Sequence, residues 1–211
     1  MPYLNPANCL APFGAIIICF CRLVCYIGIW QRERYMKNIF KILAVVFGVV
    51  ALDQITKGIL LYLITGGIPM FGPAWQIVPM PYIMTHVTDF FNIVFTWNPG
   101  ASFSLFRALG EGAPLLIIIA TGAIIGFIGY YTFRRCAGYE RWPLALILGG
   151  AIGNLIDRIR FGAVVDFLDF HIGAIHWPAF NVADIFICVG VGLYILNWYM
   201  ARRRATAKGG K

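Results

Sequence analysis

The sequence predicts an α-helical integral membrane protein, with a four-helix transmembrane bundle and a small β-rich cradle outside the cytoplasm. Of its 211 residues, 60% are hydrophobic and only 12% are charged, and the mean hydropathy is +0.78. Soluble domains are about half apolar and about a quarter charged. The basic residues also gather beside the longest apolar runs, as they do at the cytoplasmic ends of membrane helices. A chain of this length accommodates one compact membrane domain.

Four segments have about 20 mostly apolar residues each, the length that a membrane-crossing helix requires. They cover residues 40–64, 114–133, 142–159 and 182–201. Of the 17 Lys and Arg residues, four lie in 31–41, three in 134–141 and five in the C-terminal tail. Basic residues favour the cytoplasm, so the start of the first span, the link between the second and third spans and the C-terminus face that side. Because the basic residues flank apolar spans, the net charge of +8 does not indicate a protein that binds nucleic acid.

The first outer connection, 65–113, predicts the β-rich cradle. Its residues 90–97 are mainly β-branched and aromatic, which favours a strand over a helix. The connection also contains many Pro and Gly residues. We expect this long segment to cover a site at the outer membrane surface and to control access to it, as lids do in other enzymes.

The N-terminal residues 1–36 leave two interpretations open. Residues 10–30 are apolar apart from Arg22, which suits an extra hydrophobic helix, but they lack the basic start and cleavage site of a signal peptide. Met36, which lies directly before the first span, equally suits a mis-assigned chain start. The chain is therefore divided into an N-terminal hydrophobic extension (1–36), a membrane domain (37–203) and a basic cytoplasmic tail (204–211).

Two aspartates in this apolar chain are the first candidates for chemistry. Asp166 follows two valines, and Asp184 lies 18 residues later at the start of the fourth span. Carboxylates at membrane depth are costly, so their retention indicates a function. Both fall at the outer surface, where they can meet. Because two close carboxylates do not both ionise cheaply, one keeps a proton while the other can activate water. Asn181 is placed to orient either a carboxylate or a substrate.

Two further pairs of polar residues lie four positions apart within predicted helices and therefore share a helix face. Asp53 and Lys57 form either a neutralising ion pair in the first span or a support for an active site. Asn154 and Arg158 end the third span, where the arginine can extend toward lipid head groups or bind a peptide carbonyl. Asp157 points to another side of that helix, and we interpret it as structural.

Asn98 and Gly100 lie in the outer connection, in a short run of small residues. Glycine lets a backbone or a ligand approach closely, and the Asn98 amide offers both a donor and an acceptor. Without further context, a plain turn is the favoured interpretation of this segment.

The membrane carboxylates leave hydrolysis and transport open. Transporters use such groups to bind cations or protons. Hydrolysis is favoured, because we see four spans without a repeat and because the aspartates lie at the surface, whereas transporter sites lie near the midplane. The three histidines (His86, His171 and His176) and the six cysteines show no ligand spacing, so we expect neither a metal nor a cofactor.

Five motifs in the right order resemble those of the signal peptidase II family, the lipoprotein signal peptidases of bacterial inner membranes. They are Asp53-Gln54-x-x-Lys57, Asn98-x-Gly100-Ala101-Ser102-Phe103-Ser104, Gly153-Asn154-Leu155-x-Asp157-Arg158, Val164-Val165-Asp166-Phe167 and Phe180-Asn181-x-Ala183-Asp184. The resemblance covers about residues 37–203. Any one of these motifs is weak evidence, but five in order are strong.

The resemblance implies an aspartic endopeptidase that cleaves diacylglyceryl-modified prolipoproteins directly before the lipidated cysteine. It implies that Asp166 and Asp184 are catalytic. It assigns substrate binding or support of the site to Asp53, Lys57, Asn98, Gly100, Asn154, Arg158 and Asn181. It also implies inhibition by the peptide antibiotic globomycin. We expect a monomer in contact with membrane lipid, with its active site on the extracytoplasmic face and both ends of the membrane domain in the cytoplasm.

The chain departs from the family pattern near Asn98. Ser102 stands where the family usually has alanine, and Trp97 and Pro99 flank the asparagine. These changes can reshape the loop, but no position that matches a catalytic or substrate-facing residue is lost. The sequence therefore predicts an active enzyme.

Overall fold

The computed structural model describes residues 11–65, 82–100, 113–134 and 140–209, with side chains in 36–64, 82–100, 114–134 and 140–206. Residues 1–41 and 42–211 form separate units, and every candidate site residue belongs to the second. The predicted lid falls largely on 66–81 and 101–112, and Ser102 lies there too, outside the described residues.

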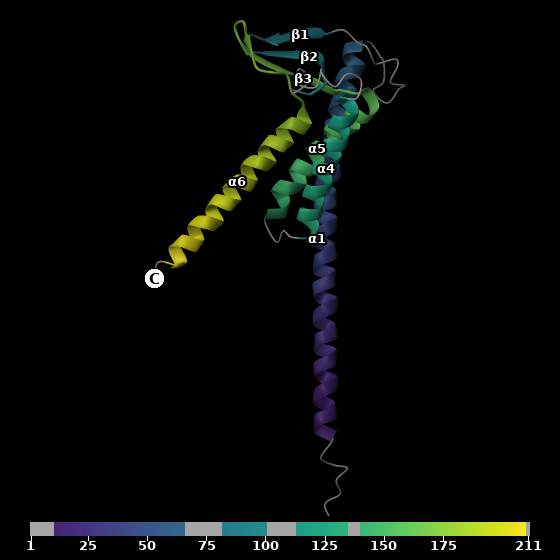
Figure 1. The fold of residues 1–211 in the computed structure, drawn as a ribbon, viewed down its shortest axis with the longest axis vertical. Coiled ribbons are helices and arrows are strands. Elements are labelled where there is room, and N and C mark those ends of the chain that lie inside the picture. The colour runs from purple at the N-terminus through teal and green to yellow at the C-terminus, as the bar shows by residue number, and fades with distance from the viewer. Residues whose placement is uncertain (1–10, 66–81, 101–112, 135–139, 210–211) are drawn as a thin grey trace, which may run out of the picture. The chain divides into compact units, whose positions relative to one another are not determined.

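The described chain alternates long helices with short strands (Figure 1). In chain order the elements are α1 (Ala11–Thr65), β1 (Ile83–Thr88), β2 (Phe91–Asn98), α4 (Ala113–Arg134), α5 (Arg141–Phe161), β3 (Val164–Ile172), β4 (Ile175–His176) and α6 (Val182–Gly209). The strand predicted at 90–97 is confirmed as β2, and Asp166 lies in β3.

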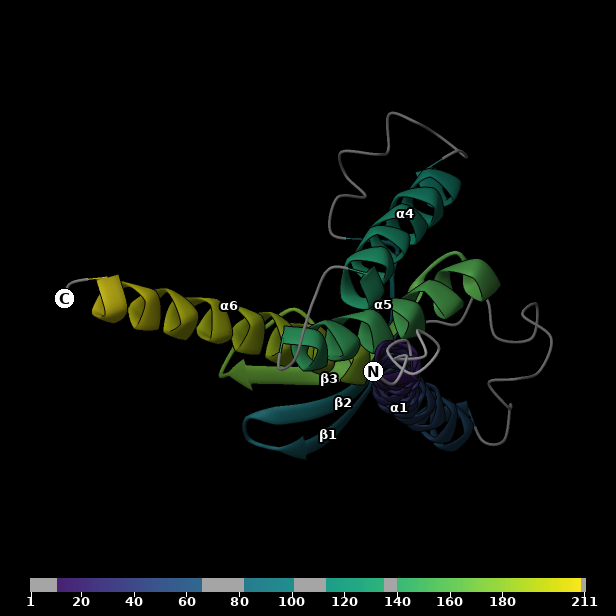
Figure 2. The same ribbon diagram turned by 90° about the horizontal axis from the view of Figure 1, so that it is seen from below.

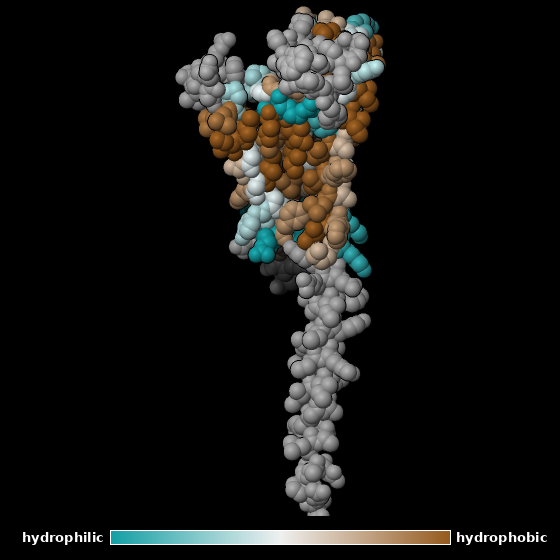
Figure 3. Space-filling view, turned by 90° about the vertical axis from the view of Figure 1, so that its right-hand side faces the viewer, coloured by the Kyte–Doolittle hydropathy of each residue, from teal (hydrophilic) through white to brown (hydrophobic). Residues whose placement is uncertain are grey.

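Three of the described helical segments are long and apolar enough to cross a membrane. They are Met36–Ile64 of α1, Pro114–Arg134 of α4 and Val182–Thr206 of α6. Many large apolar side chains on these helices are exposed, for example Phe47 at 74% and Phe127 at 70%, as expected of surfaces that face lipid. Figure 3 shows a broad hydrophobic surface on one face of the molecule. Helix α5 is more polar, because its C-terminal half carries Asn154, Asp157 and Arg158.

The strands form a small antiparallel sheet in the order β1-β2-β3-β4 (Figures 1 and 2). Strands β2 and β3 pair from Phe91 opposite Phe170 to Asn98 opposite Val164, with a bulge between Ile93 and Thr96. The turn from β3 to β4 uses Gly173 at φ +60°, a left-handed conformation that glycine adopts without strain. The predicted β-rich element is therefore present as a sheet.

The sheet is held to the helices by a short link and a small core. Helix α5 ends at Gly162, whose φ of +75° lets its N–H donate to the Arg158 carbonyl over 2.9 Å, and β3 begins two residues later. Leu61 of α1 packs against Phe95 of β2 and Val165 of β3 in a buried cluster. The strand that carries Asp166 is therefore fixed from two sides.

Small residues of α5 and α6 allow the helices to approach closely. A Cβ added at Gly149 would lie 2.6 Å from the Cβ of Val49 in α1. A Cβ at Gly150 would collide with the backbone carbonyl oxygen of Ala183 in α6. Farther along α6, a Cβ at Gly190 would lie 2.7 Å from the carbonyl oxygen of Pro143 in α5. These contacts keep the first turn of α6 against α5.

We expect Gly190→Ala to destabilise the protein because its new methyl group meets backbone, which cannot move aside as a flexible side chain can. Overpacking of this kind costs about 1–3 kcal/mol. Gly192→Ala is the matched control on the same helix, since nothing lies within 4 Å of its added Cβ. Thermal unfolding of the purified protein in one detergent measures both. Equal melting temperatures for the two variants would contradict the close contact of α5 and α6.

Candidate active site

Asp166 is buried in β3, with 1% of its surface exposed, and two asparagine amides hold its carboxylate. Asn98 Nδ2 donates to Asp166 Oδ2 over 2.8 Å. Asn181 Nδ2 donates to Asp166 Oδ1 over 2.7 Å. The antiparallel pairing of β2 with β3 and the approach of the α6 N-terminus bring these donors to the strand. Each oxygen of the carboxylate therefore has a fixed partner.

Asp184 lies in the first turn of α6, where it forms a capping box with Asn181. The backbone N–H of Asp184 donates to Asn181 Oδ1, and the backbone N–H of Asn181 donates to Asp184 Oδ2, both over 3.1 Å. Such a reciprocal pair satisfies N–H groups that a helix start leaves free. The sequence of this motif therefore starts the helix and fixes the direction of the Asp184 carboxylate at once.

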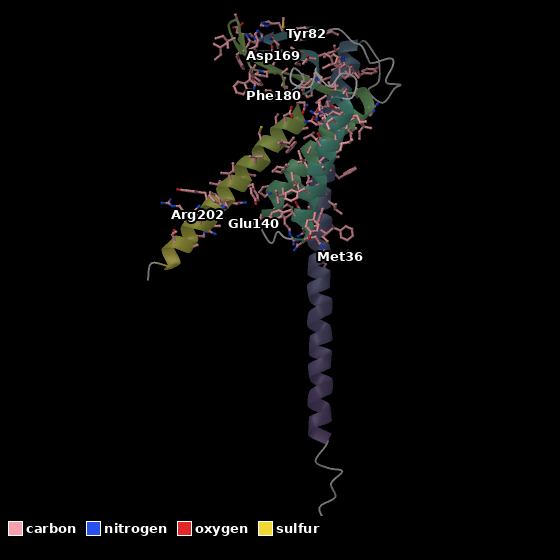
Figure 4. The ribbon with its side chains drawn as sticks, in the orientation of Figure 1. Met36, Tyr82, Glu140, Asp169, Phe180 and Arg202 are labelled. Atoms are coloured by element: carbon pink, nitrogen blue, oxygen red, sulfur yellow. The ribbon has the colours of Figure 1, made fainter. Side chains whose placement is uncertain are left out.

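Asn181 links the two aspartates. Its Oδ1 is taken up by the Asp184 backbone, so its amide nitrogen faces Asp166 and the Asn154 Oδ1, which lies 3.1 Å away. Asn154 Nδ2 in turn donates to Asp184 Oδ1 over 2.8 Å. Figure 4 shows Phe180, the residue before Asn181, where the chain passes from the sheet into α6. The two carboxylates are thus joined through two asparagine side chains.

Asn98 is oriented by the turn that follows it. The backbone N–H of Gly100 donates to Asn98 Oδ1 over 2.9 Å, and Gly100 has φ +116°. A side chain at that backbone conformation would be strained. With its oxygen engaged in the turn, the Asn98 side chain presents its amide nitrogen to Asp166.

Arg158 brings positive charge to the site from the last turn of α5. Its guanidinium interacts electrostatically with Asp184 and Asp166 and lies 3.5 Å from the Asn154 carbonyl oxygen through Nη1. Its Nε is buried and has no hydrogen-bond partner among the described residues. The arginine therefore offers a donor to a group that enters the site.

A buried charge cluster supports the site from α1 and α5. Lys57 is fully buried, and its Nζ lies 2.8 Å from Asp53 Oδ2 and 2.7 Å from Asp157 Oδ2. It also donates to Asn154 Oδ1 over 3.2 Å. Asp53 Oδ1 accepts the backbone N–H of Ala183 over 3.0 Å, so α1 also caps the start of α6. This cluster reaches both the helix start and the asparagine that hold Asp184.

The sequence did not reveal the position of Asp157 and Gln54 in this cluster. Gln54 Nε2 donates to Asp157 Oδ1 over 2.9 Å, and Asp157 Oδ2 accepts the backbone N–H of Val165 over 3.3 Å. We expected Asp157 to point away from Asn154, but both side chains contact Lys57. Asp157 also holds the strand that carries Asp166. The signal in the sequence was the charge of Lys57, because a lysine buried in an apolar span requires nearby carboxylates.

The environment of Asp166 favours its protonated form. The pKa of Asp166 is raised from its ordinary 3.8 to about 7, chiefly by burial. The negative charge of Asp184 also raises this pKa, whereas the hydrogen bonds from Asn98 and Asn181 and the charge of Lys57 partly offset the rise. Near neutral pH the pair can therefore hold one proton, which is the state that acid/base hydrolysis by two carboxylates requires.

Comparison with known proteins relates this chain to one family of membrane enzymes. The family described as Signal peptidase (SPase) II matches residues 45–200. A lipoprotein signal peptidase of Syntrophotalea carbinolica is 42% identical over 149 residues, which are 70% of this chain and 84% of that protein. One from Janthinobacterium sp. is 50% identical over 114 residues, which are 53% of this chain and 68% of that protein.

Solved structures agree with these relatives. Two structures described as bacterial membrane enzymes superpose with TM-scores of 0.58 and 0.57, at 28% and 30% identity. They cover 77% and 76% of this chain, and 89% and 93% of the solved chains. Most of the chain, including every residue of the aspartate site, falls within the matched family segment, and the chain therefore belongs to the signal peptidase II family.

Proposed function

We propose that Asp166 and Asp184 are the catalytic pair with which this aspartic peptidase removes the signal peptide from prolipoproteins. The observation that carries the proposal is the Asn181 side chain, which caps the helix bearing Asp184 and donates to Asp166. One rigid group thus sets both carboxylates. Neither the family nor the relatives support the transporter that the sequence left open.

The two aspartates differ in their surroundings, and this difference suggests their roles. Asp184 lies at the N-terminus of α6, where the helix dipole favours a negative charge. Burial favours a proton on Asp166. In our proposal the Asp184 carboxylate activates water, while protonated Asp166 polarises the scissile carbonyl. As the peptide bond breaks, Asp184 passes the proton taken from water to the leaving amine nitrogen, and Asp166 regains its own proton from a hydroxyl of the tetrahedral intermediate. Because the carboxylates are coupled, the pair titrates as one unit.

The proposed substrate-binding edge of the site is formed by Arg158, Asn98, Gly100 and Asn154. The buried Nε of Arg158 is a donor without a partner among the described residues, and the Asn98 turn lies directly beside Asp166. Asp53 and Lys57 act as support, since their contacts reach Asn154 and the α6 backbone. Globomycin would occupy this edge in place of the substrate peptide.

The membrane position of the site suits a lipidated substrate. Asp184 is the third residue of a helix that is apolar enough to span the membrane from Val182. We propose that α5 completes a four-helix bundle and that the site faces the extracytoplasmic side of the inner membrane, because the basic residues lie near the opposite helix ends. The diacylglyceryl chains would then hold the substrate cysteine at the surface, which lowers the entropic cost of positioning the bond before it.

The same proposal covers the organisation of the chain. Residues 37–203 form the peptidase domain, and 204–211 form a basic cytoplasmic tail. Residues 1–36 form an N-terminal hydrophobic extension, which contains none of the proposed site residues. We propose that the enzyme works as a monomer, since all of the site residues come from one chain.

Replacing either member of the pair by asparagine should abolish processing, because an amide neither activates water nor supplies the proton. We expect Asp166→Asn and Asp184→Asn to reduce the rate of cleavage of a lipidated prolipoprotein in detergent by at least about 10³-fold, since each removes an essential acid or base. Asp89→Asn, which changes an exposed carboxylate in the turn between β1 and β2, is the matched control. Near wild-type cleavage by either site variant would refute the catalytic assignment.

Cleavage should slow above neutral pH. The folded pKa of Asp166 is raised, so the bound proton is present below about pH 7 and is lost as the pH rises through that value. We expect the initial rate to fall by about tenfold per pH unit above this point. The same proton stabilises the fold, and that contribution is also lost as the pH rises through about 7. A rate that stays flat to pH 9, about two units higher, would contradict a proton held by the pair.

Substitutions of Asn181 can separate its two tasks. Serine still caps a helix but lacks the amide donors, whereas alanine does neither. We expect Asn181→Ser to keep a melting temperature close to that of the wild type while its cleavage rate falls by about 10- to 100-fold, the value of a hydrogen bond to the Asp166 carboxylate once it has given its proton to the scissile carbonyl. Asn181→Ala should lose both stability and activity. If the serine variant cleaves as fast as the wild type, the bridge to Asp166 has no catalytic importance.

A further inference from the structure

One face of the sheet joins Asp166 to an apolar surface. Successive residues of a strand point to opposite faces of a sheet, and residues paired across two strands point to the same face. Asp166, Leu168, Phe170 and Ile172 of β3 therefore share one face, which we call the Asp166 face. Beyond the carboxylate, every β3 side chain on this face up to the turn at Gly173 is apolar.

The neighbouring strands extend the apolar character across the width of the Asp166 face. The cross-strand pairs on this face are Ile93 with Leu168, Phe91 with Phe170, and Ile175 with Ile172. The ring centroids of Phe91 and Phe170 are 4.9 Å apart, and Phe170 stacks with Phe180 at 5.9 Å. A row of three aromatic rings thus crosses the sheet between the carboxylate and the turn.

The far end of this apolar surface is open. Phe170, Ile172 and Ile175 are 41%, 85% and 79% exposed, and all three line a hollow of about 580 Å³. Ile172 lies six residues along β3 from Asp166, which corresponds to about 20 Å in an extended strand. The Asp166 face therefore offers a long apolar track that begins beside the carboxylate.

The two faces of the sheet differ in their suitability for contact with lipid. On the opposite face, Asn92 Nδ2 donates to Asp169 Oδ2 over 2.9 Å, so that side carries a polar network. Phe180, which pairs with Leu168 on the Asp166 face, lies only two residues before the membrane span that begins at Val182. Figure 4 shows Phe180 where the chain passes from the sheet to α6. The apolar face is thus continuous with the start of the span.

A peptide matches this surface poorly. Strand β3 is paired with β2 at one edge and with β4 and Phe180 at the other, so its backbone groups are already occupied. A peptide that lay on the apolar side chains would leave its own N–H and C=O groups without partners, which is costly. A hydrocarbon chain has no such groups, and burying it removes apolar surface from water.

We propose that one acyl chain of the substrate's diacylglyceryl group lies along the Asp166 face, from Leu168 past Phe170 to Ile172. This inference rests on the proposed function, which places the bond before the lipidated cysteine at Asp166. The cysteine sulfur and a glycerol unit connect that cysteine to the acyl chains, so the chains begin close to the carboxylate pair. A bulk phospholipid also has acyl chains, but only the substrate has its chains attached to the residue that reacts.

Cleavage of two synthetic prolipoprotein peptides by the full-length protein in detergent tests this surface. The peptides differ only in the diacylglyceryl group, which carries palmitoyl chains in one and butyryl chains in the other. We expect the double variant Ile172→Ser/Ile175→Ser to lower the ratio of kcat/KM for the palmitoyl peptide over the butyryl peptide by about tenfold, because only the long chain reaches these side chains. An unchanged ratio, or an equal fall for both peptides, would overturn the proposal.

Met84→Ser is the matched control on the opposite face of the sheet. Met84 is 54% exposed, and His86, two residues later in β1, pairs with Asn92 of the polar face. The control should keep the wild-type ratio. Partitioning of the peptides into detergent affects every variant alike, so it cancels when the ratios are compared. A fall in the ratio as large as that of the double variant would overturn the assignment of the acyl chain to the Asp166 face.

Two further outcomes distinguish this inference from its alternatives. If Asp166→Asn is inactive and the double variant keeps the wild-type ratio, the acyl-chain site is refuted and the catalytic assignment stands. Cleavage by Asp166→Asn would instead refute the catalytic pair. Native mass spectrometry of the purified protein measures bound phospholipid. Loss of that phospholipid in the double variant, with an unchanged ratio, would assign the face to bulk lipid and overturn the proposal.

Discussion

The arrangement of the active site depends on one buried charge, the ammonium group of Lys57. Removing an ion from water is costly unless it is paired, so α1 and α5 cannot separate without leaving Asp157 unpaired. Each carboxylate also holds a backbone N–H of a third element: Asp53 that of Ala183 in α6, and Asp157 that of Val165 in β3. Those two elements carry the proposed catalytic aspartates. The ion pairs of Lys57 therefore fix the start of α6 relative to β3.

At the start of α6, the same side chains cap the helix and position the proposed catalytic site. The capping box of Asn181 and Asp184 satisfies backbone donors that every helix start leaves free. It also leaves the Asn181 amide nitrogen free to reach Asp166 in β3. The glycine contacts of α5 keep that first turn in place. Stability and positioning of the site thus share one set of interactions.

Local patterns in the sequence predicted the elements well, and long-range pairings were the part they could not predict. The aromatic and β-branched run at 90–97 indicated β2, and apolar length indicated the spans. The contact of Gln54 with Asp157 joins residues 103 positions apart, and nothing in either segment specifies it. The spacing of His171 and His176 in the sequence does not indicate that they are neighbours, but a turn at Gly173 pairs them across β3 and β4. The family resemblance rests on the order of the motifs along the chain, and that order does not show such contacts.

The position of Asn181 and Asp184 in the last helix has a consequence for how the enzyme is made. A chain leaves the ribosome from its N-terminus, so Asp53, Asn98 and Asp166 are all synthesised before the residues that complete the proposed site. Until α6 is synthesised and its first turn meets α5 and β3, Asp166 lacks its proposed catalytic partner. On this proposal the nascent protein does not cleave peptide bonds, and hydrolysis begins only when the fold is complete.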